Sequence, residues 1–175
     1  MDHVVDELVV SNIGDPSKEL FHLRDRPKNF YMLGSMGLAS SISLGLALSQ
    51  ENTVVCLDGD GSILMNLGSL VTIASTKPGN LVLVALDNGA YGTTGNQTSY
   101  TSGDADLEKM ARACGFEATF KTHNVEELSS VVEECLDIGS PSFIHVLIQT
   151  DETKFDPVPM DPITIKSRFM KEISE

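Results

Sequence analysis

The chain has 175 residues, 41% of them hydrophobic, and this length and composition suit one compact domain with a sizeable core. Its formal net charge of −13 argues against nucleic acid or an anionic membrane surface as the main partner. No stretch reaches the roughly 18 apolar residues that a membrane span needs, and the acidic start lacks the basic region of a secretory signal. Three cysteines, Cys56, Cys114 and Cys135, favour free thiols in a reducing compartment over a disulfide framework. These features predict a soluble protein of the cytoplasm.

Apolar runs alternate with helical patterns through the first half of the chain. Asp15 is a plausible cap for the first helix, because Pro16 follows it at a first-turn position. A glycine-rich turn is expected over 58–62, before a helical stretch that ends near Thr76. The other elements expected here are strands at 8–10, 30–33 and 53–57 and helices at 15–23 and 38–48.

The alternation continues in the second half, interrupted by a long polar loop over 87–104, of a kind that compact domains seldom carry without a function. His145 lies in an apolar strand, which is typical of a core histidine with a satisfied hydrogen bond. Continuous apolar strands between helices predict an α/β fold with a mostly parallel, twisted sheet and helices on both faces. The expected strands are 81–86, 117–121 and 142–148, and the expected helices are 106–113 and 125–138.

Residues 151–175 form a tail of this single expected domain, 1–175. The tail is rich in Pro and Asp before a short amphipathic stretch over 163–173. Two interpretations are open: the tail clasps a partner chain, or it ends in a solvated helix.

Two polar turns carry most of the functional information. Each follows an apolar strand, at the carboxyl ends where open parallel sheets bind their ligands. In the first turn, Gly59 and Gly61 let the backbone approach a ligand closely, and the amides of Gly61 and Ser62 would begin a helix with N–H groups free for phosphate. Asp60 of this turn and Asn88 of the second supply the hard oxygen ligands that Mg²⁺ prefers.

A backbone carbonyl near Ala90 would add a third ligand to this predicted magnesium site. Gly59-Asp60-Gly61 followed by Asp87-Asn88 resembles the motif of the thiamine-diphosphate enzymes, which begins GDG and closes with two Asn. Asp87 replaces the first Asn, whereas Asn88 preserves the family's metal ligand. The resemblance implies thiamine diphosphate and Mg²⁺ as cofactors, with Ser62, Ala90 and Tyr91 also at the site.

A second motif, Gly34-Ser35-Met36-Gly37, follows the expected strand 30–33. The resemblance places this segment across the middle of the cofactor. It makes the Gly34 carbonyl the acceptor for the cofactor's 4′-amino group, and the Met36 side chain the wedge that keeps the cofactor bent. An ordinary core methionine is the alternative interpretation of Met36.

Longer runs over 29–41, 57–62, 65–70 and 87–97 are similar to the beta subunits of sulfopyruvate decarboxylases, with phosphonopyruvate decarboxylases as siblings. The resemblance implies a carboxy-lyase that converts 3-sulfopyruvate to sulfoacetaldehyde and CO₂, toward coenzyme M. Thr93, Thr94 and Gln97 would face the small anionic 2-oxoacid. A lid that makes no direct contact with the substrate is the alternative.

All the family motifs in the chain belong to the pyrophosphate-binding half. The resemblance implies that a separate pyrimidine-binding (alpha) subunit supplies the activating Glu, in a hetero-oligomer. Three alternatives stay open: half of a phosphonopyruvate decarboxylase, a non-catalytic regulatory subunit that binds magnesium diphosphate, and the beta subunit of a thiamine-dependent synthase or oxidoreductase. The sequence lacks the Cys-x-x-Cys clusters that iron–sulfur oxidoreductases usually carry.

Overall fold

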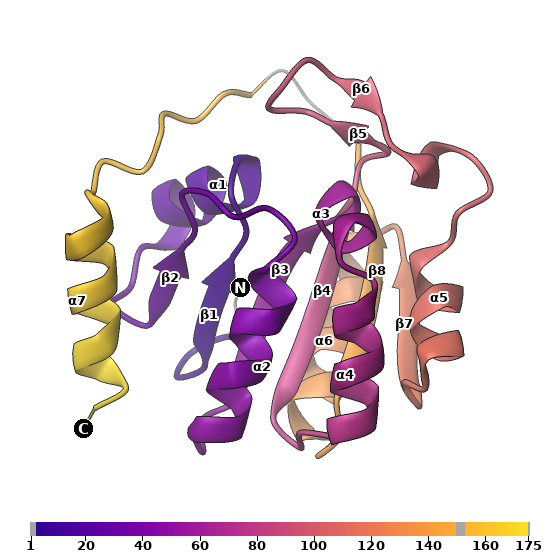
Figure 1. Ribbon diagram of the computed structural model, residues 1–175, viewed down its shortest axis with the longest axis horizontal. Helices are drawn as coiled ribbons and strands as arrows, with labels where there is room; N and C mark the ends of the chain where they lie inside the picture. Colours follow the sequence, from indigo (N-terminus) through magenta and orange to yellow (C-terminus); the bar gives the residue numbers. More distant parts are fainter. Residues whose placement is uncertain (1–2, 150–152, 175) are drawn as a thin grey trace.

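The structure, a computed structural model, describes residues 3–149 and 153–174. Its centre is a six-stranded sheet in the order β2-β1-β3-β4-β8-β7, and every neighbouring pair in it is parallel (Figure 1). Parallel strands bring all their carboxyl ends to one edge of the sheet, and the polar turns that follow them meet there. The strands are β1 (Leu8–Ser11), β2 (Asn29–Tyr31), β3 (Val54–Gly59), β4 (Leu81–Asp87), β7 (Ala118–Thr122) and β8 (Ser142–Leu147).

Helices cover both faces of this sheet, and each face has its own apolar core. On one face, Leu70, Ile73 and Leu107 pack against the strands, and on the other Leu20 and Cys135 do so. The expected α/β architecture is therefore confirmed. The first face carries α2 (Ala39–Ser49), α3 (Asp60–Met65), α4 (Gly68–Thr76) and α5 (Leu107–Cys114), and the second carries α1 (Asp15–Arg24) and α6 (Val125–Asp137).

The amphipathic stretch of the tail is α7 (Pro162–Glu172), and it packs along β2 at the edge of the sheet (Figure 1). The rings of Phe169 and Phe30 are 5.4 Å apart, and Arg168 makes two hydrogen bonds to the Asp25 carboxylate, of 2.7 and 2.6 Å. Of the two interpretations of the tail, the solvated terminal helix does not hold for the side of α7 that carries Ile165 and Phe169, which is buried against its own chain. The other interpretation, a clasp on a partner chain, stays a prediction. The start of the expected tail, residues 150–152, lies outside the described residues.

The turn expected over 58–62 is also wrong. β3 continues through Asp58 and Gly59, which pair with Ala85 and Leu86 of β4, and α3 begins at Asp60. The ladder of hydrogen bonds to β4 thus extends the strand two residues into the expected turn. The helical stretch expected to reach Thr76 is divided at Asn66, whose backbone leaves the helical region and whose side chain donates to the Gly37 carbonyl at 2.8 Å.

Two further expectations need correction near the same edge. Gly14, with a φ of 86°, occupies the N-cap of α1, so Asp15 is the first helical residue and pairs with Lys18 instead of capping. The segment over 87–104 is not a plain loop, because it holds a two-stranded hairpin and a turn of 3₁₀ helix. These are β5 (Ala90–Tyr91), β6 (Gln97–Thr98) and η1 (Tyr100–Ser102).

Two of the general expectations concern burial and membranes. Cys56 and Cys135 are buried free thiols, as expected, and Cys114 is a partly buried one. No helix in the described part of the chain is both long enough and apolar enough to cross a bilayer.

Candidate functional site

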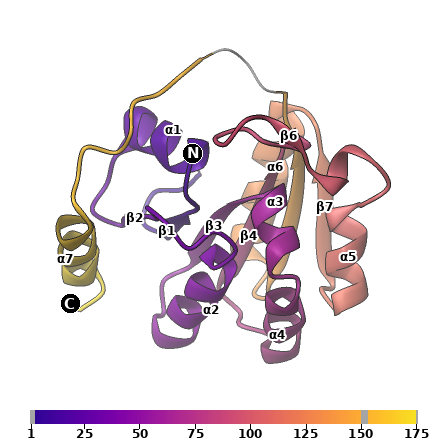
Figure 2. The same cartoon turned by 45° about the horizontal axis from the view of Figure 1, so that its top comes forward.

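A cavity of about 620 Å³ opens at the carboxyl ends of the central strands. Asn12 lines it after β1, Asp60 after β3 and Asn88 after β4. Figure 2, in which this end of the molecule is turned forward, shows the segment around β6 lying over the strand ends. The lining includes these residues of the predicted site: Met36, Gly59, Asp60, Gly61, Ser62, Asn88, Ala90, Tyr91, Thr93 and Thr94.

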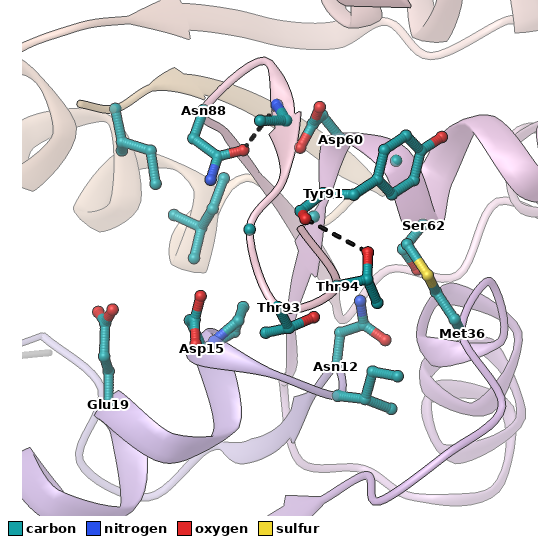
Figure 3. A pocket seen from close by; sticks show the side chains of 18 of the residues that line it. Asn12, Asp15, Glu19, Met36, Asp60, Ser62, Asn88, Tyr91, Thr93 and Thr94 are labelled. Atoms are coloured by element: carbon teal, nitrogen blue, oxygen red, sulfur yellow. Dashed lines mark hydrogen bonds between the residues drawn. The ribbon is translucent and has the colours of Figure 1, made fainter. Parts of the chain in front are cut away.

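The two motif turns are in direct contact inside this cavity. The ring of Tyr91 lies so close to Gly61 that a β-carbon added there would overlap three of its ring carbons. A glycine at this position is therefore required for the hairpin to close over the start of α3. Figure 3 shows Tyr91 between Asp60 and Ser62, above Thr93 and Thr94 of the same hairpin.

Asp60 is buried, and its side chain is held by hydroxyl groups from the segment that follows β6. Oδ2 of Asp60 accepts a hydrogen bond from the hydroxyl of Ser99 and lies 3.1 Å from Oγ1 of Thr101. Burial raises the pKa of the Asp60 carboxyl, the nearby charge of Asp87 raises it further, and the hydroxyl donors oppose both. A cation near this carboxylate would favour its charged form.

Asn88 lies on the same cavity with its side chain folded back over its own turn. Its Oδ1 accepts from the backbone N–H of Ala90 at 3.0 Å (Figure 3). A carbonyl oxygen has two lone pairs, so this bond leaves capacity for a second partner. Asp60 and Asn88 are thus brought to one cavity, as the motif predicts.

Asn12 is a cavity residue that the sequence reasoning missed. It is buried, and its Oδ1 has no hydrogen-bond partner among the described residues. Asn12 directly follows β1, as Asp60 directly follows β3. A polar residue at the end of a predicted strand was therefore the feature of the sequence that could have indicated it. Two neighbouring buried atoms, Ser11 Oγ and Asp58 Oδ2, also lack partners in the described part of the chain, and burial raises the pKa of Asp58 to about 6.

Three predicted residues lie outside the cavity lining. Gly34 and Ser35 are exposed, and Ser35 has a φ of 59°, whereas Met36 turns into the cavity. The backbone N–H of Gly37 donates to Ser62 Oγ at 2.9 Å, which ties this loop to α3. Gln97 is exposed in β6 and accepts from the Thr94 hydroxyl at 3.1 Å.

The donor set suits a small hard cation and a phosphate group. Within 3–149 and 153–174 there is no cluster of three or more His, Cys, Asp or Glu side chains that could hold a metal. A magnesium site built from Asp60, the Asn88 amide and the Ala90 carbonyl needs only one such residue, because phosphate oxygens and water complete it. The cavity also lies within the range of small-molecule and cofactor sites, about 300–1,000 Å³. These residues therefore fit a magnesium diphosphate group.

Comparison with known proteins agrees with this geometry. The family model described as "Thiamine pyrophosphate enzyme, C-terminal TPP binding domain" matches residues 12–146, which hold every predicted site residue. The chain belongs to this family. Membership confirms the resemblance seen in the motifs and gives thiamine diphosphate as the cofactor of the chain.

Individual relatives narrow the position of the chain within the family. It is 48% identical to the sulfopyruvate decarboxylase subunit beta of Methanocaldococcus jannaschii over 167 residues, which cover 95% of this chain and 88% of that protein. It is 43% identical to the phosphonopyruvate decarboxylase of Streptomyces viridochromogenes over 144 residues, covering 82% of this chain but 36% of that one.

The fold also occurs in a solved 2-oxoglutarate:ferredoxin oxidoreductase from Magnetococcus marinus. The TM-score is 0.69 at 18% identity, and the match covers 86% of this chain and 56% of that one. This likeness concerns the fold alone.

Proposed function

We propose that the chain is the beta subunit of a thiamine-diphosphate-dependent 2-oxoacid decarboxylase, and that its substrate is 3-sulfopyruvate, converted to sulfoacetaldehyde and CO₂ on the way to coenzyme M. The supporting observation is that Asp60 and Asn88 line one cavity in a chain 48% identical to a sulfopyruvate decarboxylase subunit beta. The free cysteines are consistent with a reducing, cytoplasmic location.

In this proposal, the cavity holds the diphosphate end of the cofactor. The Asp60 carboxylate, the Asn88 amide oxygen and the Ala90 carbonyl bind Mg²⁺. Backbone N–H groups in the first turn of α3, at Gly61 and Ser62, have no carbonyl partners within the helix and would donate to phosphate oxygens. Gly59 lets the chain approach that group closely.

Thiamine diphosphate, when bound, supplies the electron sink for the electrons released as CO₂ leaves. The chain's own residues orient the reactants. Met36 forms one side of the cavity, where its side chain would press against the bound cofactor and set its conformation, and the exposed loop at Gly34 and Ser35 would continue along the cofactor. Thr93 and Thr94 present hydroxyl groups to the substrate from the hairpin, and Gln97 holds Thr94 in place.

The proposal requires a partner subunit that carries the activating glutamate. An exposed apolar patch beside the cavity suits such a partner: Leu33 is 51% exposed, Leu38 44% and Met65 62%. A β-carbon built on Gly37 would lie 3.3 Å from Cβ of Met65, so the patch adjoins the loop that carries Met36. Several exposed apolar side chains around one loop suit a protein interface.

Phosphonopyruvate is the second candidate substrate, because a phosphonopyruvate decarboxylase is 43% identical to the chain. Both substrates are small 2-oxoacids with a second acidic group. The identity to the sulfopyruvate enzyme is higher and covers most of both chains, which favours the sulfonate.

Reconstitution tests the proposal. The chain is combined with its candidate partner, thiamine diphosphate and Mg²⁺, and CO₂ and aldehyde are measured with sulfopyruvate, phosphonopyruvate and pyruvate. We expect sulfopyruvate to be turned over faster than phosphonopyruvate and pyruvate, and only when both subunits are present. Turnover of phosphonopyruvate alone would support the second candidate. Cofactor binding without turnover of any substrate would favour a regulatory subunit, and carboligation or electron transfer would favour a synthase or oxidoreductase.

A further inference from the structure

Asp87 and His145 form a buried contact behind the turn that carries Asn88. They lie on β4 and β8, which are parallel neighbours in the sheet. His145 donates from Nε2 to Oδ2 of Asp87 at 2.7 Å, and the two side chains are 1% and 3% exposed. Neither residue lines the cavity, so neither is placed to touch the cofactor or the substrate.

The second oxygen of Asp87 faces the metal-binding turn. Oδ1 accepts from the backbone N–H of Gly89 at 2.9 Å and from Thr101 Oγ1 at 2.7 Å. Gly89 directly follows Asn88 and has a φ of 68°, which glycine adopts without strain. Asp87 therefore holds the backbone beside Asn88 in a fixed conformation.

Thr101 connects Asp87 to Asp60. Its Oγ1 lies 2.7 Å from Asp87 Oδ1, 3.1 Å from Asp60 Oδ2 and 2.7 Å from Ser99 Oγ. A hydroxyl group has one proton to donate. The shorter contact directs this proton to Asp87, and Ser99 then donates to Asp60. Thr101 Oγ1 is then bonded to Asp87 and packs against Asp60 Oδ2 and Ser99 Oγ, so a displaced Asp87 would shift an atom that touches the Asp60 carboxylate.

The other ring nitrogen of His145 faces a second carboxylate. Its Nδ1 lies 3.6 Å from Oδ1 of Asp106, whose Oδ2 pairs with Lys121 at 2.9 Å. Asp106 also accepts from the backbone N–H of Lys109 as the N-cap of α5. The imidazole therefore lies between two carboxylates, with Nε2 bonded to Asp87 and Nδ1 facing Asp106 without a hydrogen bond.

We propose that His145 is a positioning residue for the magnesium site: its hydrogen bond to Asp87 holds Thr101 and Gly89 so that Asp60 and Asn88 point at the same ion. This inference rests on the proposed function of Asp60 and Asn88 as metal ligands. Partners behind metal ligands typically change metal affinity by about 10- to 100-fold when they are removed.

Two substitutions of His145 separate positioning from packing. His145→Leu removes the donor and keeps an apolar side chain of similar size. His145→Gln keeps an N–H that can reach Asp87. The control Ile144→Val alters the neighbouring buried residue of β8, which belongs to the apolar core and not to the polar network. Thr101→Val removes the connecting hydroxyl from η1 and does not alter β8.

The measurement is the Kd for thiamine diphosphate at fixed Mg²⁺, and for Mg²⁺ at fixed thiamine diphosphate, by calorimetry on the full chain with its partner subunit. Circular dichroism establishes that each variant is folded. His145→Leu and Thr101→Val are expected to weaken binding by about 10-fold or more, His145→Gln to restore most of it, and Ile144→Val to leave it unchanged. If the losses are not additive in the double variant His145→Leu/Thr101→Val, the two residues act on the magnesium site through the same hydrogen-bonded contacts.

The inference is overturned if folded His145→Leu binds as tightly as the wild type, or if Ile144→Val weakens binding equally. If His145→Leu does not fold, Thr101→Val decides, and an unchanged Kd in that variant overturns the inference. A wild-type chain that binds no thiamine diphosphate with Mg²⁺ would instead refute the proposed function, which the positioning role requires.

Discussion

The aromatic ring of Tyr91 rests on the α-carbon of Gly61, joining the hairpin after β4 to the first turn of the helix after β3. This contact closes the two motif turns around one cavity. It also explains why the second glycine of the Gly-Asp-Gly motif has no room for a side chain.

Gly61→Ala is expected to lower the free energy of unfolding by about 1–3 kcal/mol, because the new methyl group overlaps the Tyr91 ring. Urea denaturation measures the change. Gly45→Ala is the matched control, since a β-carbon at Gly45 meets nothing within 4 Å and alanine favours a helix, so this variant should be more stable by about 0.5–1 kcal/mol. Equal stability of Gly61→Ala and wild type would contradict the contact.

Asp60→Asn is expected to weaken Mg²⁺-dependent binding of thiamine diphosphate by about 100-fold or more. This loss is larger than the one expected for a residue, such as His145, that only positions the metal ligands. The apo chain should not lose stability to the same degree, because burial already disfavours the Asp60 charge and raises its pKa. Calorimetry and thermal melting measure the two effects. Asp104→Asn, an equal charge change at an exposed position, is the control. Decarboxylation that survives Asp60→Ala would exclude the metal assignment.

Asp25→Asn tests the ion pair that fastens α7. The Arg168 hydrogen bond holds the pKa of the Asp25 carboxyl below its ordinary value of 3.8. A lowered folded-state pKa contributes stability above the ordinary value, and this contribution is lost as the pH falls through the folded-state pKa. The free energy of unfolding of the wild type should exceed that of Asp25→Asn by about 1 kcal/mol at neutral pH, after solvent screening, and the difference should shrink as the pH falls below 3.8. Urea titrations at several pH values measure it; a constant difference would contradict the ion pair.

Leu33→Asp and Met65→Asp test the apolar patch beside the cavity. A buried charge at the centre of an interface is costly, so each variant should weaken association with the partner subunit by about 10-fold or more. Surface plasmon resonance measures the Kd. Val125→Asp, on a helix of the opposite face, is the control, because Val125 is 76% exposed. Unchanged affinity in both patch variants would place the partner on another surface.

The fold and most of the cavity lining could be predicted from the sequence, because both follow from local patterns. Continuous apolar runs between helices give a parallel sheet, and parallel strands place the turns after β3 and β4 at one edge. The boundary of β3 was predicted two residues too short. Nothing local to Asp58 and Gly59 indicates that their backbones pair with β4.

The contacts behind the cavity could not be predicted, because they join residues far apart in the chain. Ser99 and Thr101 reach Asp60 from about 40 residues away, and His145 reaches Asp87 from 58 residues away. His145 was correctly expected to be a buried core residue, yet its partner is the residue at which the motif departs from the family. A hydrogen bond between two strands leaves no periodic signal in either of them.

The position of α7 has a consequence for how the protein behaves in solution. An outer strand with a free row of N–H and C=O groups is a template for intermolecular β-pairing and for aggregation. β2 is such a strand, and α7 shields it with Phe169 and Ile165. Loss of α7 by proteolysis would therefore expose the edge strand β2 to pairing with other chains, even though the cofactor cavity lies elsewhere.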